Sequence, residues 1–470
     1  MTVRLYDSRA QAVVDFAPLE PGKVSMYVCG PTVQSSPHIG HLRSALVYDL
    51  WRRWLSYRSF DVTLVRNVTD IDDKVLDNAT EHEAWWALAY RIELEFSAGY
   101  SALGIQPPTY EPRATASIPQ MVAIIERLIE RGHAYPAPDD SGDVYFDTAS
   151  WPSYGELTRQ KADDMVAATD ADPRGKRDPR DFALWKGTKT GEPESASWAS
   201  PWGAGRPGWH IECSAMSSRY LGAAFDIHGG GLDLRFPHHE NELAQTTAAG
   251  DAFASYWVHN GLVNVNGQKM SKSLGNSLYA AEFLAMARPI AVRYYLGTAH
   301  YRSTIDYHDG ALLEAEAAVE RIEAFLSRAS SRLDGTRYAG SGVEQVPEAF
   351  ADAMDDDLSV PQAIAVLHDT VRAGNTALDD EDLAAVASAR GAVLAMTEIL
   401  GINPLSPQWR TDAAEPAERA LASLVDSLVA DRNAARAAKD FTTADRIRDE
   451  LAAAGITVED GAGATRWSLS

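Results

Sequence analysis

The first part of the chain changes from a strand-like to a helix-like spacing of apolar residues and back. Residues 24–28 form an apolar run typical of a buried strand, and a loop with Gly30, Pro31 and Pro37 follows. A helix is predicted next from apolar side chains mostly four apart, namely Leu42, Leu46, Leu50, Trp51, Trp54 and Leu55. Residues 60–66 again have a strand pattern. This order predicts a βαβ unit that begins a doubly wound, Rossmann-like parallel sheet.

Downstream, the pattern is interrupted and then resumes. A helix is predicted over 118–132, whereas 141–207 is rich in Pro, Gly, Asp and Lys. We interpret about 115–207 as an insertion between two halves of the sheet. Strand patterns return at 225–228 and 256–258, and 262–265 precedes Asn266-Gly267, a strong hairpin signal.

The character of the chain changes again near residue 309. Helical periodicity dominates to about residue 400, which indicates a helical bundle, and Pro404 and Pro407 mark a linker. Helices and a small glycine-turn unit are expected in 411–470. We therefore predict an α/β catalytic domain over 1–308, a helical bundle over 309–403 and a small C-terminal domain over 404–470.

Composition narrows the class of protein. A chain of 470 residues with 45% hydrophobic and 23% charged residues is long enough for several ordinary globular cores. Its formal net charge of -23 argues against sequence-blind nucleic-acid binding, although basic residues gathered on one face can still hold RNA. Two cysteines do not form a disulfide framework, and no apolar run approaches the ~18 residues of a membrane span. We expect a cytoplasmic protein without a membrane partner.

Two short motifs suggest phosphate chemistry. His38-Ile39-Gly40-His41 lies where the first strand gives way to a helix, and a helix N-terminus favours anions. Lys269-Met270-Ser271-Lys272-Ser273 follows the predicted hairpin and can bring cations to a transition state. Taken alone, the His38–His41 motif would also fit a helix start with two solvated histidines. The Lys269–Ser273 motif would also fit a solvated basic turn. Together, in this order, they predict attack by a carboxylate on the α-phosphate of ATP.

A possible metal site involves the only two cysteines, Cys29 and Cys213. His238 and Glu242 are four residues apart, so on one helix, with Pro237 in its first turn, they would face the same way. With the cysteines they would complete a four-ligand zinc site. Spacing alone leaves other sets open: His239 with Glu242, Glu240 as the carboxylate, or cysteines that only pack in the core.

Longer motifs carry a resemblance to a known family. They are residues 26–32 (MYVCGPT), 66–74 (RNVTDIDDK), 208–214 (GWHIECS), 225–231 (FDIHGGG) and 236–242 (FPHHENE). The chain resembles class I aminoacyl-tRNA synthetases, and most closely cysteinyl-tRNA synthetase, over essentially its whole length. The resemblance implies zinc ligands Cys29, Cys213, His238 and Glu242, and an open zinc position that reads the substrate thiol. Serine, which shape alone separates poorly from cysteine, would then be rejected without editing.

The resemblance also implies roles in the pocket. The carboxylate of cysteine, with a pKa near ~3.5, needs no general base, so catalysis rests on positioning and charge. We assign this to His38, His41, Lys269 and Lys272, with Mg²⁺ on the leaving pyrophosphate. ATP would contact Gly40, Asn260 and Gly261 as well as His38, His41 and Lys272. The substrate pocket would contain Tyr27, Gly30, Thr69, Trp209, His228 and Asp233, of which Asp233 would bind the ammonium unless it only forms an Asx turn.

The C-terminal domain is expected to bind the anticodon of tRNA(Cys). Arg432, Arg436, Lys439 and Arg446 recur at helical spacing, either as a phosphate-facing stripe or as an ordinary solvated face. We assign base contacts to Phe441, Asp445 and Asp460. Cysteine would pass from its adenylate to a hydroxyl of the 3′-terminal adenosine, and the family resemblance implies the 2′-hydroxyl.

Two other functions compete with this interpretation. A cysteine ligase of the mycothiol type passes the same adenylate to an amino-sugar, but lacks a C-terminal tRNA-binding region. A non-catalytic tRNA-binding paralogue would not need the intact motifs. The family resemblance further suggests a monomer.

Overall fold

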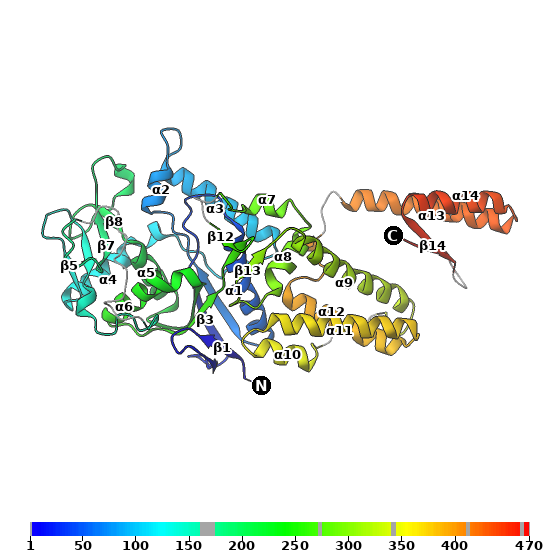
Figure 1. Ribbon diagram of the computed structural model, residues 1–470, viewed down its shortest axis with the longest axis horizontal. Coiled ribbons are helices and arrows are strands. Elements are labelled where there is room, and N and C mark those ends of the chain that lie inside the picture. Colours follow the sequence, from blue (N-terminus) through cyan, green and yellow to red (C-terminus); the bar gives the residue numbers. More distant parts are fainter. Residues whose placement is uncertain are drawn as a thin grey trace. The chain divides into compact units, whose positions relative to one another are not determined.

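The computed structural model describes residues 2–159, 174–270, 275–339, 345–409, 414–460 and 465–469. The chain forms two compact units, Met1–Pro404 and Leu405–Ser470 (Figure 1).

A four-stranded parallel sheet lies inside the first unit, in the order β10–β9–β3–β4. Its strands are β3 (Lys23–Val28), β4 (Asp61–Arg66), β9 (Ala224–Gly231) and β10 (Phe253–Asn260). The predicted strands 24–28, 60–66, 225–228 and 256–258 all fall in it. The prediction of a doubly wound parallel sheet is confirmed.

Helices cover both faces of this sheet. α1 (Ile39–Tyr57) packs on β4 and β9, while α5 (Trp209–Leu221) packs on β3 and β9. Successive side chains of a strand point to opposite faces. Val28 and its register partner Arg66 lie with Ala45 and Tyr48 of α1. The neighbouring Tyr27 and its partner His228 therefore face α5.

The remaining elements of the catalytic part surround the central sheet. Its helices are α2 (Asp73–Asn78), α3 (Trp85–Ala102), α4 (Ile118–Glu130), α6 (Glu240–Ala248), α7 (Ala280–Leu284) and α8 (Pro289–Thr298). The antiparallel strands β5 (Ala134–Pro136), β6 (Val144–Phe146), β7 (Phe182–Gly187) and β8 (Gly205–Pro207) form a separate sheet. Smaller sheets contain β1 (Arg4–Asp7), β2 (Ala12–Asp15), β11 (Val263–Val265), β12 (Gln268–Lys269) and β13 (Ile305–Tyr307).

The hairpin predicted at Asn266-Gly267 joins β11 to β12. Both turn residues have positive φ, 51° and 75°, which favours asparagine and glycine there. This turn places Lys269 at the end of the hairpin.

Four helices follow in the same unit: α9 (Ala311–Leu333), α10 (Glu348–Asp355), α11 (Val360–Asp379) and α12 (Leu383–Leu400). They pack on one another, as predicted for a bundle. α12 is, by length and composition, apolar enough to cross a membrane. Since 67% of it is buried inside the fold, it has the character of a core helix.

The second unit contains α13 (Ala414–Ala437), α14 (Phe441–Ala453) and an antiparallel hairpin of β14 (Ile456–Asp460) and β15 (Thr465–Leu469). Its small core joins both helices to the hairpin through Val425, Val429, Ile447, Leu451 and Ile456. The unit therefore has a core of its own.

Candidate active site and metal centre

The predicted phosphate motif forms the N-terminus of α1. His38 is the N-cap, and its Nδ1 accepts the backbone N–H of Gly40 at 3.1 Å. His41 Nδ1 in turn accepts the backbone N–H of His38 at 3.1 Å, so the two imidazoles form a capping box. Because both Nδ1 atoms accept, the proton of each neutral ring is on Nε2. The two rings stack with centroids 3.7 Å apart.

Burial, with a smaller effect of His38, lowers the pKa of His41 to about 3. His41 is therefore neutral at neutral pH and can serve an anion as an N–H donor rather than as a cation. Gly40 keeps this arrangement open, because a Cβ there would lie 3.0 Å from the His38 ring.

These residues open onto a pocket of about 430 Å³ at the carboxyl ends of the parallel strands. Such crevices are the usual ligand sites of doubly wound sheets. The pocket brings together many of the residues predicted from sequence, namely Cys29, Gly30, His38, Gly40, His41, Trp209, Asp233, Asn260, Gly261 and Lys269.

The second motif is described only in part. Lys269 is exposed and lines the pocket, as does Met270. The predicted Lys272 lies outside the described residues. Opposite the hairpin, Gly261 leaves no room for a side chain, since a Cβ would lie 2.2 Å from the carbonyl oxygen of Ser303. The backbone of residues 260–261 therefore forms a close wall of the pocket.

A buried cluster of metal-ligating side chains lies at Cys29, on the α5 side of the sheet. The ligand atoms of Cys29, Cys213, His238 and Glu242 all lie within 4.8 Å of one another. Cys29 Sγ is 3.6 Å from Cys213 Sγ and 3.4 Å from Glu242 Oε1. Glu242 Oε1 is 3.0 Å from His238 Nε2. The structure thus assembles the four predicted ligands from three segments: Cys29 after β3, Cys213 on α5, and His238 with Glu242 around the start of α6.

The two distances from Cys29 Sγ fit a zinc ion, whereas the 3.0 Å between His238 Nε2 and Glu242 Oε1 is shorter than the separation of two zinc ligands. With Zn–S distances of ~2.3 Å and Zn–N or Zn–O distances of ~2.1 Å, tetrahedral ligand atoms are about 3.4 to 3.8 Å apart. Burial raises the pKa of both thiols, and each is raised further by the neighbouring Glu242 carboxylate. Burial lowers the pKa of His238, which keeps the imidazole neutral and able to coordinate. Two buried thiols beside a carboxylate are a donor set that a cation would stabilise.

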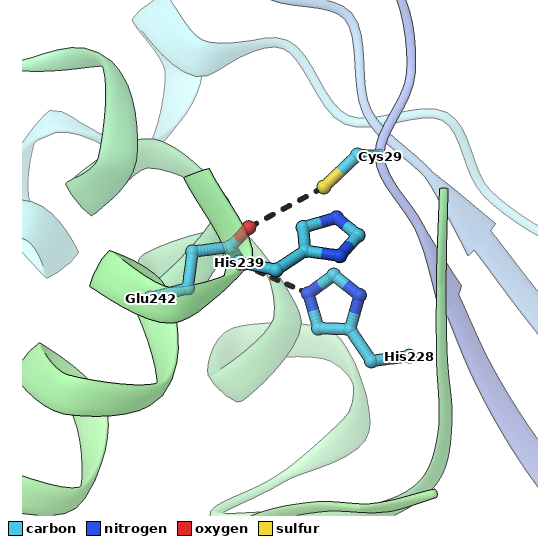
Figure 2. Close-up of side chains that lie close together, drawn as sticks. All are labelled: Cys29, His228, His239 and Glu242. Carbon is cyan, nitrogen blue, oxygen red and sulfur yellow. Dashed lines mark hydrogen bonds and ion pairs between the residues drawn. The ribbon is translucent and has the colours of Figure 1, made fainter. Parts of the chain in front are cut away.

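Figure 2 shows a second set of possible ligands that shares Cys29 and Glu242 and adds His228 and His239. His228 Nε2 lies 2.9 Å from Glu242 Oε2, the oxygen that His238 does not contact. His239 Nδ1 lies 2.9 Å from His259 Nε2. The sequence had left His239 open as a ligand, but gave no signal for His259, which lies on a strand with no nearby motif.

In the first ligand set, the other ring nitrogen of His238 also has a partner. His238 Nδ1 lies 2.9 Å from His210 Nδ1, and burial lowers the pKa of His210 to about 3. A neutral His210 can accept the Nδ1–H of His238, which leaves His238 Nε2 free to coordinate. The signal for His210 was its place in residues 208–214, three positions before Cys213.

One local prediction needs correction. We expected His238 and Glu242 on one helix with Pro237 in its first turn. Instead α6 begins at Glu240, and 235–239 form a π-helical turn that contains a cis Phe236–Pro237 bond. Glu240 is not near the cluster, because its carboxylate accepts the backbone N–H groups of Gly155 and Thr158.

The other predicted pocket residues separate into two groups. Tyr27, Thr69 and His228 are 0%, 1% and 0% exposed and lie behind the pocket wall. The Trp209 ring stacks on His238 with centroids 4.2 Å apart, and so joins the pocket to the cluster. Asp233 is exposed at the pocket edge.

The residues predicted to bind tRNA are not all exposed. Phe441 is 62% exposed at the start of α14, and Arg436 and Asp445 are exposed, with Asp445 paired to Arg448 at 3.1 Å. Arg432 is only 6% exposed, because it continues the face of α13 that carries Val425 and Val429. It therefore does not belong to the predicted exposed stripe. Asp460 ends β14.

Comparisons with known families agree along the chain. Residues 15–317 match the family described as tRNA synthetases class I (C) catalytic domain. Residues 349–404 match the DALR domain, and 418–467 match the cysteinyl-tRNA ligase anticodon binding domain.

Individual proteins are similar over their full length. The chain is 71% identical over 475 residues to a cysteine–tRNA ligase of Leifsonia xyli subsp. xyli, covering 100% of both chains. It is 70% identical to that of Clavibacter sepedonicus, covering 100% of this chain and 99% of the relative. Among solved structures, a methionyl-tRNA synthetase of Mycobacterium tuberculosis in complex with methionyl-adenylate has a TM-score of 0.58 at 15% identity, covering 81% and 90% of the two chains. That likeness is one of fold.

Proposed function

Because the chain belongs to the cysteinyl-tRNA synthetases of class I, we propose that its buried Cys29, Cys213, His238 and Glu242 bind zinc and select cysteine by its thiol. The enzyme is a cysteine–tRNA ligase, which activates cysteine with ATP and transfers it to tRNA. Full-length identity and the matching anticodon-binding domain do not support the amino-sugar ligase.

The observation that carries the proposal is the convergence of two thiols, one imidazole and one carboxylate within 4.8 Å beside the pocket. A zinc ion bound there would supply a much stronger affinity for a thiolate than for an alcohol. Trp209 both stacks on His238 and lines the pocket, so it can hold the substrate side chain against the cluster.

Positioning and charge would then carry the adenylation step. The cysteine carboxylate is ionised at neutral pH and attacks the α-phosphate without a base. His38 and His41 would donate their Nε2–H groups to phosphate oxygens at the N-terminus of α1. Lys269 from the hairpin and Lys272, which lies outside the described residues, would add positive charge on the leaving side. Mg²⁺ would accompany the pyrophosphate as part of the ATP substrate.

The far side of the pocket would hold the nucleoside. Asn260 and Gly261 end β10, and their close backbone favours a flat base packed against it. Asp233 at the pocket edge would bind the substrate ammonium. Tyr27, Thr69 and His228 would shape the pocket from behind. We likewise propose that the chain is a cytoplasmic monomer of three domains, 1–308, 309–403 and 404–470.

The decisive experiment is cysteine-dependent ATP–pyrophosphate exchange with a Cys213→Ser variant. We expect loss of bound zinc and of exchange, with ATP binding retained, because the pocket does not include Cys213. A metal-free preparation that kept the preference for cysteine over serine would overturn the proposal.

A further inference from the structure

Arg66, the last residue of β4, is a largely buried arginine in the lining of the active-site pocket. The residue is 7% exposed and lines the pocket. Its Nε donates to Glu111 Oε1 at 2.9 Å, and its guanidinium carbon lies 4.2 Å from the centroid of the Tyr100 ring. Within the described part of the chain, neither terminal nitrogen of Arg66 has a hydrogen-bond partner. Neither nitrogen is among the fully buried polar atoms that lack a hydrogen-bond partner. Both are therefore accessible to a ligand.

The strand register separates Arg66 from the metal cluster. Arg66 pairs with Val28 on the α1 face of the sheet, whereas Tyr27 and His228 face the cluster. β4 is also an edge strand, with β9 and β3 between it and β10. Since neighbouring strands are ~4.8 Å apart, Arg66 lies about 14 Å across the sheet from the wall formed by Asn260 and Gly261.

α3 links Arg66 to the phosphate motif. The ring of His41 contacts Phe96 with centroids 5.0 Å apart, and Arg66 stacks on Tyr100, one helical turn further along α3. Tyr100 and Glu111 thus fix the guanidinium plane, while its two terminal nitrogens remain available. A planar fork of donors suits two oxygens of a carboxylate or a phosphate group.

We propose that Arg66 binds an oxyanion of a substrate at the β4 end of the pocket, through its two terminal nitrogens. The proposal rests on the assignment of this pocket to the ligase reaction. Two substrate groups have the required chemistry and would lie away from the nucleoside wall: the carboxylate of the amino acid, and the phosphodiester before the terminal adenosine of the RNA. Both would be held beside the N-terminus of α1, where the reacting groups meet.

The test compares Arg66→Gln and Arg66→Lys with the wild-type enzyme in two assays. If the ligand is the carboxylate, kcat/KM for cysteine in pyrophosphate exchange falls about 10- to 100-fold in Arg66→Gln, with KM for ATP within about twofold. If it is the phosphodiester, exchange is unchanged and single-turnover transfer from preformed adenylate falls by that factor. Either result supports the proposal. Exchange and transfer both within about twofold of wild type would overturn it.

Arg113→Gln is the matched control. Arg113 also pairs with a carboxylate, Glu93, and stacks on a tyrosine of α3, Tyr90, but it does not line the pocket. It should leave both assays unchanged. If Arg66→Gln does not fold, Arg66→Lys is used instead, because lysine keeps the positive charge but lacks the two parallel donors of the guanidinium group. Wild-type rates of exchange and transfer in Arg66→Lys would then overturn the proposal. His41→Asn should impair pyrophosphate exchange whether or not Arg66 binds a substrate. Unimpaired exchange in His41→Asn would therefore show that the pocket is not the site of the ligase reaction, independently of the result for Arg66.

Discussion

The backbone N–H of His38 donates to Nδ1 of His41 at 3.1 Å, so the proton of the neutral His41 ring is on Nε2. Folding lowers the pKa of His41 from 6.5 to about 3. Between these values the unfolded chain binds one more proton than the folded chain. The free energy of unfolding should therefore fall as the pH falls through this range, by at most ~1.4 kcal/mol per pH unit for this group.

A His41→Gln variant tests this dependence. Its stability deficit relative to wild type should shrink as the pH is lowered from about 6 to about 4, because the variant has no such group to protonate. Urea unfolding at several pH values measures the difference. A deficit that stays constant over the range would show that His41 titrates normally in the folded enzyme.

His228 should support the proposed metal site without being a ligand. Its Nε2 holds Glu242 Oε2 at 2.9 Å, which orients the other oxygen toward His238 and Cys29. Loss of such a partner typically reduces metal affinity ~10- to 100-fold, and we expect this for His228→Asn. Competition with a chromophoric zinc chelator measures the affinity, with His133→Asn, which contacts Ser150 in the inserted region, as the control. Unaltered affinity would mean that Glu242 is held by other groups.

Asp73 should stabilise the inserted antiparallel sheet against the catalytic part. It pairs with Lys186 of β7 at 2.7 Å and with Arg206 of β8, whose side chain is 3% exposed. Although burial opposes ionisation, the two cations lower the pKa of Asp73 to about 2. This contribution to stability is therefore present above about pH 4 and is lost as the pH falls toward 2.

In an Asp73→Asn variant, Glu192 at 2.9 Å would be the remaining charge partner of Arg206 among the described residues. We expect the free energy of unfolding at neutral pH to fall by about 1 to 3 kcal/mol, less than for a fully buried pair since Asp73 is partly exposed. Glu81→Gln, at an exposed position next to α2, is the control. The expected pH dependence would be contradicted by a variant that is as stable as wild type at neutral pH but less stable than wild type at low pH.

Phe441 should affect recognition of tRNA but not activation of cysteine. Its ring is 62% exposed in a unit that has its own core. Stacking of one base contributes ~1 to 3 kcal/mol, so Phe441→Ala should reduce kcat/KM for tRNA about 5- to 150-fold. Pyrophosphate exchange should be unchanged. Leu424→Ala, an equally exposed apolar position at 65%, is the control, and equal losses in both variants would point to general destabilisation.

The individual strands of the sheet, the helix start at His38 and the hairpin at Asn266-Gly267 could be predicted because each depends on neighbouring residues. The four predicted metal ligands also lie together, although spacing alone had left His239 open, and only the family resemblance favoured His238. The local geometry around Pro237 was predicted wrongly, because i, i+4 spacing does not distinguish an α-helix from a π-helical turn that leads into one.

Residue type and spacing along the chain, by themselves, determined the elements, the phosphate motifs and the donors available for a metal. Only the tertiary structure decided which face each side chain occupies. Strand register put His228 behind the wall and Arg66 into the pocket, and the packing of α13 buried Arg432. The physical reason is that burial and pairing depend on contacts between segments far apart in the chain, which local periodicity does not encode.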